Sequence, residues 1–229
     1  MLELTLKHDG KYENNFFDVA VEATFTSPTS ARHHIKGFYY GQDLWKVRFR
    51  PNEVGSWKYE YSLTANDVSH RGEGRFESMP SDLPGRLEQN RRNVYRWVFA
   101  NGQPYFPVGL QDCIAAKDGK FGGGVIDGGS REEGGRSVSW DKYFAVYGKA
   151  GFNLLRFSQR NCSPSLFDDL DHYRVAESIA TDQLLAAARR NGFRIMFGFF
   201  GSYGLLSHEN RILRKLKNTV GPLIGLHQE

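Results

Sequence analysis

The strongest constraint in this sequence is an internal repeat of one pattern, an amphipathic helix followed by a glycine and a short apolar strand. The first copy consists of a predicted helix over 140–150, Gly151 and the apolar run FNLLRF. The second consists of a predicted helix over 173–191, Gly192 and the apolar run FRIMFGFF. Each glycine stands where a helix end favours a left-handed residue, and each apolar run is too short for another helix. The repeat therefore predicts parallel strands with helices packed over them.

Folds of this kind bind their ligands at the carboxyl ends of the parallel strands. A further parallel strand is predicted within 104–110, as the second limb of a hairpin that turns at Asn101-Gly102. The polar residues that follow the three predicted strands are Gln111, Asp112, Arg156, Ser158, Gln159, Arg160, Ser202 and Tyr203. These residues are the candidates for a functional site.

Arg156 is unusual because it lies inside an otherwise apolar strand. A buried charge costs several kcal/mol unless it is paired, so we expect Arg156 to have a carboxylate partner. Asp112 on the neighbouring strand is one possible partner, and a carboxylate on a later strand of a longer protein is another. A structural ion pair and a functional site are equally compatible with this pattern.

Residues 2–78 follow a different period, because apolar and polar side chains alternate and turn residues interrupt them. The alternation is clearest in 19–26, 45–50 and 57–62, and it predicts antiparallel sheets with one buried face. Six or seven short strands in about 80 residues are typical of an immunoglobulin-like β-sandwich. The segment MPSDLP at 79–84 is read as a linker, which gives predicted domains of 1–84 and 85–229.

The aromatic residues of this first region could fill the sandwich or stack on sugar rings. They are Phe38, Tyr39, Tyr40, Trp45, Trp57, Tyr59 and Tyr61. Their places on the alternating apolar face favour packing in the core. Because Tyr39 and Tyr40 are consecutive, at least one of them is expected to face outward.

The composition excludes several classes of function. The net charge of +4 is small for 229 residues and no basic run is present, which argues against a nucleic-acid partner. The sequence contains no apolar stretch of transmembrane length and no signal peptide, so the chain as written is expected to be cytoplasmic, without a membrane partner. Cys113 and Cys162 follow predicted parallel strands and are expected to be reduced thiols, with a disulfide across the mouth of the sheet as the alternative.

No metal or cofactor is predicted. The glycine-rich segment 122–135 lacks the motifs that bind nucleotide phosphates and is predicted to be a long, flexible rim loop. Asp168, Asp169 and Asp171 lack the EF-hand spacing and are predicted to lie in a solvated loop. The seven histidines show no zinc-binding spacing.

Several segments resemble a known family. They are GFYYG at 37–41, WKVRF at 45–49, GSWKY at 55–59, FANG at 99–102, YFPVG at 105–109 and GFNLLRF at 151–157. The first three resemble the immunoglobulin-like domain of unknown function that precedes bacterial glycoside-hydrolase barrels, including apiosidase-like and collagen-binding-domain-associated enzymes. The last three are similar to the beginning of such a barrel. The parent proteins of this family are expected to be secreted or periplasmic.

The resemblance implies a fold and a set of site residues. The fold is an immunoglobulin-like sandwich followed by an incomplete (β/α)8 barrel of three to four βα units, because 85–229 is shorter than the roughly 250 residues of a full barrel. Gln111, Asp112, Arg156 and Gln159 would line a carbohydrate cleft, and Arg156 would support the catalytic carboxylates. In the family one such carboxylate ends the fourth strand and the other ends the seventh. Glu229 could be a remnant of the first, after a truncated strand at 223–228, whereas the seventh strand is missing.

Three functions therefore remain open. The first is the N-terminal fragment of a glycoside hydrolase, which itself lacks the catalytic carboxylates. The second is a carbohydrate- or protein-binding sandwich module with a vestigial α/β segment. The third is a complete small enzyme of the doubly wound α/β type. Oligomeric state is not predicted by any of these patterns.

Overall fold

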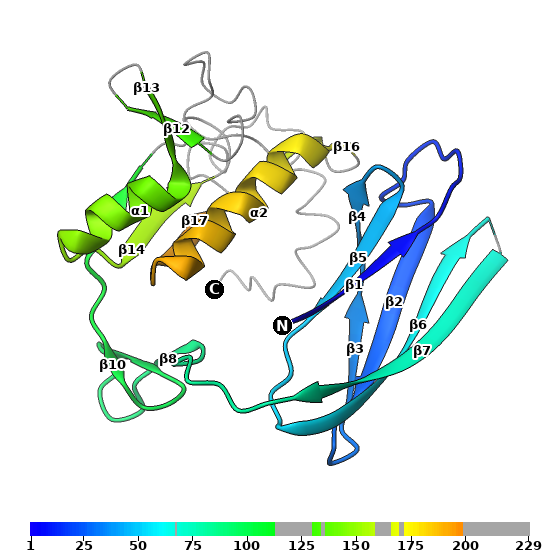
Figure 1. Ribbon diagram of the computed structural model, residues 1–229, viewed down its shortest axis with the longest axis horizontal. Helices are drawn as coiled ribbons and strands as arrows, with labels where there is room; N and C mark the ends of the chain where they lie inside the picture. The colour runs from blue at the N-terminus through cyan, green and yellow to red at the C-terminus, as the bar shows by residue number, and fades with distance from the viewer. Residues whose placement is uncertain (67, 113–129, 134–135, 159–165, 170–171, 199–229) are drawn as a thin grey trace, which may run out of the picture. The chain divides into compact units, whose positions relative to one another are not determined.

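The computed structural model describes residues 1–66, 68–112, 130–133, 136–158, 166–169 and 172–198. The chain divides into two compact units, Met1–Pro84 and Gly85–Glu229, which are described separately (Figure 1). Within the described part, neither helix has the length and apolar character that crossing a membrane requires.

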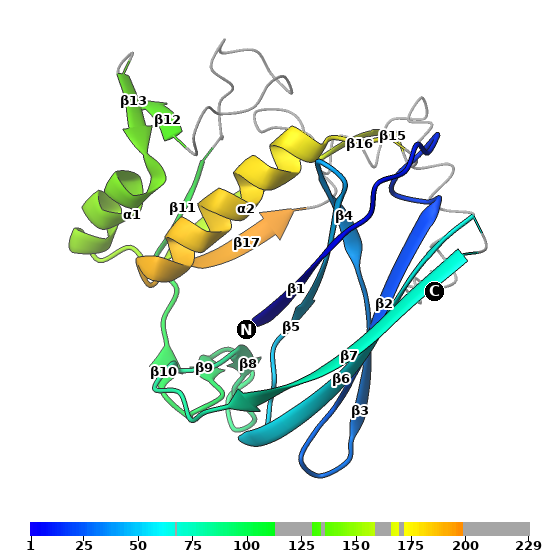
Figure 2. The ribbon, with the colours of Figure 1, turned by 45° about the vertical axis from the view of Figure 1, so that its right-hand side comes forward.

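The N-terminal unit consists of seven strands in two antiparallel sheets. The strands are β1 (Leu2–Lys7), β2 (Val19–Thr26), β3 (Arg32–Lys36), β4 (Phe38–Gly41), β5 (Leu44–Phe49), β6 (Gly55–Ala65) and β7 (Val68–Ser78). One sheet has the strand order β1-β5-β4 and the other the order β3-β2-β6-β7. Figure 2 shows the two longest strands, β6 and β7, side by side along the second sheet.

The alternating side chains of these strands build one core between the two sheets. Phe25 and Trp57 from one sheet and Trp45 and Val47 from the other are each 1% exposed or less. The two indole N–H groups donate to backbone carbonyls, that of Trp45 over 3.3 Å and that of Trp57 over 3.1 Å. Large aromatic rings can be buried completely here because their polar atoms find hydrogen-bond partners inside the unit.

Two tyrosine rings of β6 lie over glycines of β7. Tyr61 faces Gly72 and Tyr59 faces Gly74 in the strand register. A Cβ atom at Gly72 would lie 2.5 Å from the Tyr61 ring, and one at Gly74 would lie 2.4 Å from the Tyr59 hydroxyl oxygen. A larger residue at either position would have to displace the neighbouring tyrosine ring, so the close approach of the rings favours glycine at both positions.

The C-terminal unit combines one parallel sheet with smaller antiparallel sheets. Its strands are β8 (Leu87–Gln89), β9 (Trp97–Phe99), β10 (Pro104–Tyr105), β11 (Gly109–Gln111), β12 (Ser130–Glu133), β13 (Arg136–Ser139), β14 (Leu154–Ser158), β15 (Phe167–Asp169), β16 (His172–Tyr173) and β17 (Arg194–Gly198). Its described helices are α1 (Trp140–Lys149) and α2 (Val175–Arg190). The parallel sheet has the order β11-β14-β17, whereas β8-β9-β10, β12-β13 and β15-β16 are antiparallel.

Both helices cover the same face of the parallel sheet, as Figures 1 and 2 agree in showing. Phe144 of α1 and Leu184 of α2 are at most 1% exposed, and they share a core with Leu155 and Phe157 of β14. Phe193, which precedes β17, extends this core and packs against the ring of Phe144 with centroids 4.8 Å apart. The apolar residues of the repeat thus form the core that the helix–glycine–strand pattern predicts.

The helix ends also follow the sequence. The side chain of Ser139 caps α1 by accepting a hydrogen bond from the Lys142 backbone N–H over 3.3 Å. Gly151 and Gly192 have φ values of 87° and 76°, so the predicted left-handed residues after both helices are confirmed. The hairpin of β9 and β10 and the parallel pairing of β11 with β14 are confirmed as well.

The prediction of an incomplete (β/α)8 barrel is wrong. The described residues of the C-terminal unit form a parallel sheet of only three strands, accompanied by small antiparallel sheets, and contain two helices. A barrel requires a helix after every parallel strand and a sheet of eight strands closed on itself. The repeat predicted the helix–strand units but carried no information on how many strands join or whether their sheet closes.

A second correction concerns the segment 122–135, which was predicted to be a rim loop. Its described residues, 130–133, form β12, which pairs antiparallel with β13. The rest of the segment lies outside the described residues. The abundance of glycine predicted a loop, but it does not show which short stretch pairs with a neighbouring strand. The predicted helix at 209–218, the strand at 223–228 and Glu229 lie outside the described residues.

The two glycines after the helices give a first prediction. In the Gly151→Ala variant we expect a loss of about 1 kcal/mol in the free energy of unfolding, because a Cβ atom strains a left-handed backbone. No atom lies within 4 Å of the added Cβ at Gly151, so the loss reports backbone strain alone. Urea unfolding combined with amide exchange in α1 and β14 measures the effect.

A matched control lies three residues earlier in the chain. Gly148 is in α1, and its added Cβ would make an ordinary contact of 3.5 Å with the Phe193 ring. Gly148→Ala should therefore stabilise the helix by about 0.5–1 kcal/mol. Equal destabilisation by the two substitutions would contradict the assignment of Gly151 to the left-handed region.

Candidate functional site

Polar side chains meet on the face of the parallel sheet that the helices do not cover. Gln111, Arg156 and Met196 are aligned in the register of β11, β14 and β17. Because side chains alternate along a strand, Arg156 points away from the core that Leu155 and Phe157 enter. The guanidinium Nη1 of Arg156 donates a hydrogen bond to the side-chain oxygen of Gln111. The structure thus brings together two of the predicted site residues.

Asp112 follows Gln111 at the carboxyl end of β11, and its side chain points to the side of the sheet that α1 covers. Its backbone N–H donates to the Arg156 carbonyl over 3.1 Å, which continues the pairing of β11 with β14. Its carboxylate accepts a 2.7 Å hydrogen bond from the hydroxyl of Tyr143 in α1. Tyr143 is 4% exposed, so its ring fixes this hydroxyl from within the core. A buried helix residue therefore orients a half-buried carboxylate at the end of the sheet.

Tyr143 was not among the residues predicted for the site, because a tyrosine among the apolar residues of a helix is typical of a core position. Its ring is indeed in the core, and only its hydroxyl reaches the site. One signal in the sequence could have indicated this role. It is a tyrosine on an otherwise apolar helix face, close to the amino end of a helix that covers a parallel sheet. The polar tip of such a ring needs a partner, and strand ends supply one.

The argument that burial forces a carboxylate partner on Arg156 is wrong, because its side chain lies on the exposed face of β14. The hydrogen bond of Arg156 to Gln111 joins it to a neutral amide. Gln159 and the other candidates Arg160, Ser202 and Tyr203 lie outside the described residues, as do Cys113 and Cys162.

Small residues stand at the end of the same face. Ser158 of β14 is opposite Gly198 of β17, and a Cβ atom at Gly198 would lie 2.9 Å from the Cβ of Ser158. A larger residue at position 198 would have to displace this neighbour. Because the residues at this end of the sheet are small, their side chains project less from the sheet than the side chain of Arg156 does.

Asn153 fixes the entry of the chain into this site. Its side-chain oxygen accepts from the Val108 N–H over 2.9 Å, and its amide donates to the Phe106 carbonyl over 2.9 Å. The Tyr105 hydroxyl lies 3.0 Å from the Asn153 carbonyl oxygen and 3.1 Å from its side-chain oxygen. Burial raises the pKa of Tyr105, against the opposing charge of Arg194, so the phenol stays a donor. One asparagine thereby ties the residues before β11 to the residue before β14.

The N-terminal unit has an organised polar surface of its own, which we call the aromatic–cation platform. It consists of Glu3, Phe38, Tyr40, Lys46 and Arg48 on the outer face of the sheet β1-β5-β4. The Glu3 carboxylate accepts from the Lys46 ammonium over 2.6 Å and from the Arg48 guanidinium over 2.7 Å. Partial burial acts to raise the pKa of Glu3, but the hydrogen bonds and charges of these two cations hold it below its ordinary value.

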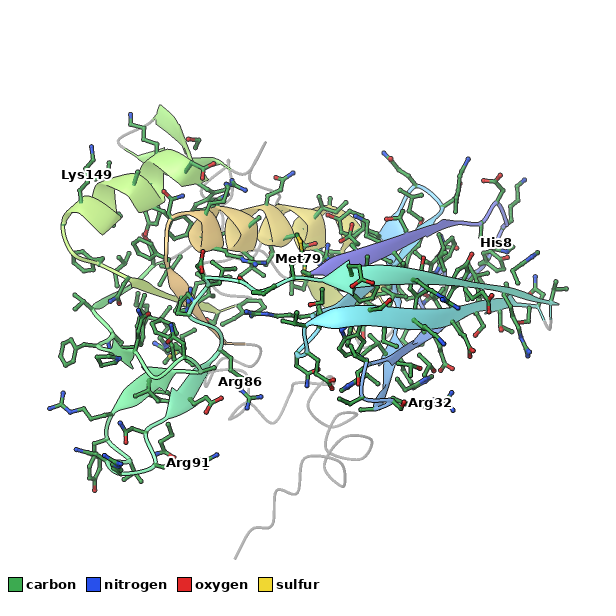
Figure 3. The ribbon with its side chains drawn as sticks, turned by 60° about the horizontal axis from the view of Figure 1, so that its bottom comes forward. His8, Arg32, Met79, Arg86, Arg91 and Lys149 are labelled. Carbon is green, nitrogen blue, oxygen red and sulfur yellow. The ribbon has the colours of Figure 1, made fainter. Side chains whose placement is uncertain are left out.

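A pocket of about 390 Å³ lies elsewhere in the N-terminal unit. Residues of β1 and of the pair β6–β7 line it, together with His8, which follows β1 and is labelled in Figure 3. The rings of His8 and His70 are 5.6 Å apart, and the His8 ring also hydrogen-bonds to the Tyr12 hydroxyl. Across the part of the chain that the structure describes, no three His, Cys, Asp or Glu side chains are grouped to hold a metal ion. Two histidines alone do not complete a zinc site.

Comparison with known proteins gives two matches. Residues 1–64 match the family model described as a domain of unknown function, DUF5060. The structure is similar to the crystal structure of a candidate glycoside hydrolase from Bacteroides vulgatus, with a TM-score of 0.63 and 18% sequence identity. No curated protein matches the sequence.

The extent of the structural match matters for its meaning. It covers 97% of this chain but 45% of the Bacteroides vulgatus chain, so this chain spans less than half of that protein. At 18% identity the likeness concerns the fold. The chain is thus related in fold to a glycoside-hydrolase-like protein, and the DUF5060 match lies within the N-terminal unit.

The Asn153 contacts predict a graded loss of stability. We expect Asn153→Ala to lower the free energy of unfolding by about 3 kcal/mol, because three side-chain hydrogen bonds disappear. Tyr105→Phe removes one hydroxyl from the same cluster and should cost about 1 kcal/mol. Denaturant unfolding of both variants measures the two losses. A smaller loss in Asn153→Ala than in Tyr105→Phe would mean that Asn153 does not hold these segments together.

The ion pairs of Glu3 predict a dependence of stability on pH. Because the pKa of Glu3 is lower in the folded protein than its ordinary value of 4.5, its charge stabilises the fold at pH values above 4.5. This contribution is lost as the pH falls through the lower pKa of the folded state. Wild type should therefore melt above Glu3→Gln at pH 7, and the two melting temperatures should converge as the pH falls below the lowered pKa of Glu3. A constant difference across this range would show that Glu3 acts without its charge.

Proposed function

We propose that this chain is the N-terminal, glycan-binding part of a glycoside hydrolase that acts on O-glycosidic bonds of a polysaccharide or glycan. The observation that supports this proposal is the likeness in fold to a candidate glycoside hydrolase over 97% of the chain. In this proposal carbohydrate is the partner, and Gln111, Asp112, Arg156 and Gln159 line the part of the cleft that this chain supplies.

The described site residues suit sugar binding. The Gln111 amide and the Arg156 guanidinium are planar groups on an exposed sheet face, where they can exchange their mutual hydrogen bond for sugar hydroxyls. Asp112 can accept from a second hydroxyl while Tyr143 holds it in place. Affinity then comes from several directed hydrogen bonds on strands whose positions the core fixes.

Hydrolysis makes a further demand. It needs two carboxyl groups on opposite sides of the glycosidic bond. At the described end of the parallel sheet, Asp112 supplies one carboxylate, and the Tyr143 hydroxyl already occupies one of its oxygens. We therefore propose that the chain by itself binds a glycan without cleaving it, and that Asp112 orients the sugar.

We further propose that the N-terminal unit is an immunoglobulin-like sandwich without its first strand. Its sheets β1-β5-β4 and β3-β2-β6-β7 have the pairing order of the immunoglobulin strands BED and C′CFG when β1 is taken as strand B. All the pairings are antiparallel, as that fold requires. The second candidate function, a carbohydrate- or protein-binding sandwich module, is favoured by the aromatic–cation platform on its outer face.

The proposal is tested by measuring binding and cleavage with the same 229-residue chain. Isothermal titration against a panel of soluble polysaccharides should show binding, and assays of reducing-end release should show no turnover. Arg156→Gln should weaken the binding at least about tenfold, since a hydrogen bond to a charged group is worth about 1.5–3 kcal/mol. Arg189→Gln, on the exposed side of α2, is the matched control and should bind as wild type does.

Two outcomes would overturn the proposal. Efficient turnover that Asp112→Asn abolishes would show that the chain carries its own catalytic carboxylate. Failure to bind every polysaccharide of the panel, in a protein that is folded by circular dichroism, would remove the carbohydrate function itself.

A further inference from the structure

The aromatic–cation platform has an ordered arrangement across its three strands. Lys46 and Arg48 lie on the central strand β5, with Glu3 on β1 to one side and the rings of Phe38 and Tyr40 on β4 to the other. Glu3 is opposite Arg48 in the strand register, and Phe38 is opposite Lys46. The two cations therefore connect a carboxylate on one edge strand to an aromatic pair on the other.

Contacts of the cations with the rings fix this arrangement. The Lys46 ammonium lies 3.8 Å from the centre of the Tyr40 ring. The Arg48 guanidinium lies 5.0 Å from the centre of the Phe38 ring and 5.5 Å from that of Tyr40. The Phe38 and Tyr40 rings meet edge to face with centroids 6.2 Å apart. Rings held in this way lose little conformational freedom when a ligand binds.

The rings of Phe38 and Tyr40 are not needed for the core. Tyr39, which stands between them, packs against the buried cluster of the sandwich and lies 4.9 Å from the Trp45 ring. Phe38 points to the opposite face and remains 37% exposed. The sequence predicted that one of the consecutive tyrosines would face outward, and Tyr40 does so. Phe38 is exposed and Tyr40 is partly exposed, so both rings have surface that can stack on the C–H face of a sugar.

The charges of the platform indicate the kind of sugar. Two cations and one carboxylate give these side chains a net charge of +1. The Arg48 guanidinium can bind a planar carboxylate through two parallel N–H groups, a geometry that a neutral sugar cannot use. A carboxylate next to a stacked ring would thus match the platform in both charge and shape.

We propose that the aromatic–cation platform is a second glycan-binding site, specific for chains that contain uronic acid sugars. The rings of Phe38 and Tyr40 stack against the sugar, while Arg48 and Lys46 bind its carboxylate beside Glu3. This inference rests on the proposed carbohydrate function but names a different surface, in the other unit of the chain. It requires binding only, with no change in covalent bonds.

The experiment is isothermal titration of the 229-residue chain with polygalacturonate, and with the same polymer after its carboxyl groups have been reduced to alcohols. We expect binding of polygalacturonate that is at least tenfold tighter than binding of the reduced polymer. Phe38→Ala and Tyr40→Ala should each weaken polygalacturonate binding about tenfold, and Arg48→Gln should remove the preference for the acidic polymer. Tyr40→Phe keeps the ring and should bind within twofold of wild type.

Two controls separate the platform from general charge and from folding. Tyr95→Ala removes a tyrosine that is 90% exposed in the C-terminal unit and should leave binding unchanged. Dextran sulfate tests attraction to any polyanion, and the ring variants should not alter its binding. Circular dichroism and the melting temperature of each variant show that the sandwich is intact.

Equal affinity for the acidic and the reduced polymer would overturn the uronic acid assignment. Unchanged affinity for polygalacturonate in a folded Phe38→Ala or Tyr40→Ala protein would overturn the proposed site. Binding of a protein to the platform, without binding of polysaccharide, would overturn it as well. These results are distinguishable from failure of the cleft proposal, because Arg156→Gln reports on the parallel sheet and the platform variants report on the sandwich. If the wild-type chain bound neither polygalacturonate nor any polysaccharide of the panel, both proposals would be overturned.

Discussion

Burial of apolar side chains on one face of the parallel sheet decides what the C-terminal unit can present to a ligand. Leu155 and Phe157 enter the core beneath α1 and α2. Successive strand residues point in opposite directions, so Arg156 between them must lie on the face without helices. The same rule places Gln111 and Met196 beside it. The packing of Leu155 and Phe157 on one face therefore determines which residues lie on the polar face. The backbone of these polar residues is held in place by the core.

The local structure of this chain was largely predictable from its sequence. The alternation in 19–26 and 57–62 specifies a buried face, and helix–glycine–strand order specifies parallel units, because both depend on side-chain direction within a few residues. The size of the parallel sheet depends on contacts between distant segments, so the expected barrel was wrong. The glycine-rich stretch before β12 was predicted to be a loop for a similar reason, since the pairing of β12 with β13 depends on contacts between two segments.

The candidate site was predictable in position but not in its contacts. Strand ends pointed to Gln111, Asp112 and Arg156, and the register of β11 and β14 brings Gln111 and Arg156 together. Asp112 follows Gln111, and its side chain meets α1 on the other side of the sheet. The partner of Asp112 is a hydroxyl on a core ring of α1, which no spacing in the sequence reveals. The proposed glycoside-hydrolase function is argued from likeness of fold, whereas the two proposed binding surfaces are argued from side-chain chemistry. These surfaces stand on separate units, so each can be tested without disturbing the other.

The tyrosine rings over Gly72 and Gly74 have a consequence for how the sandwich avoids misassembly. The strand β7 contributes no side chain of its own at these two inward positions, and the space is filled from β6 by Tyr61 and Tyr59. If β7 slid by two residues in either direction, only one of the two glycines would still face a tyrosine ring. The other ring would face His70 or Phe76, depending on the direction, and would collide with it. The tyrosine rings of β6 and the glycines of β7 thus fit together in only one register, which keeps the eleven-residue edge strand in one alignment.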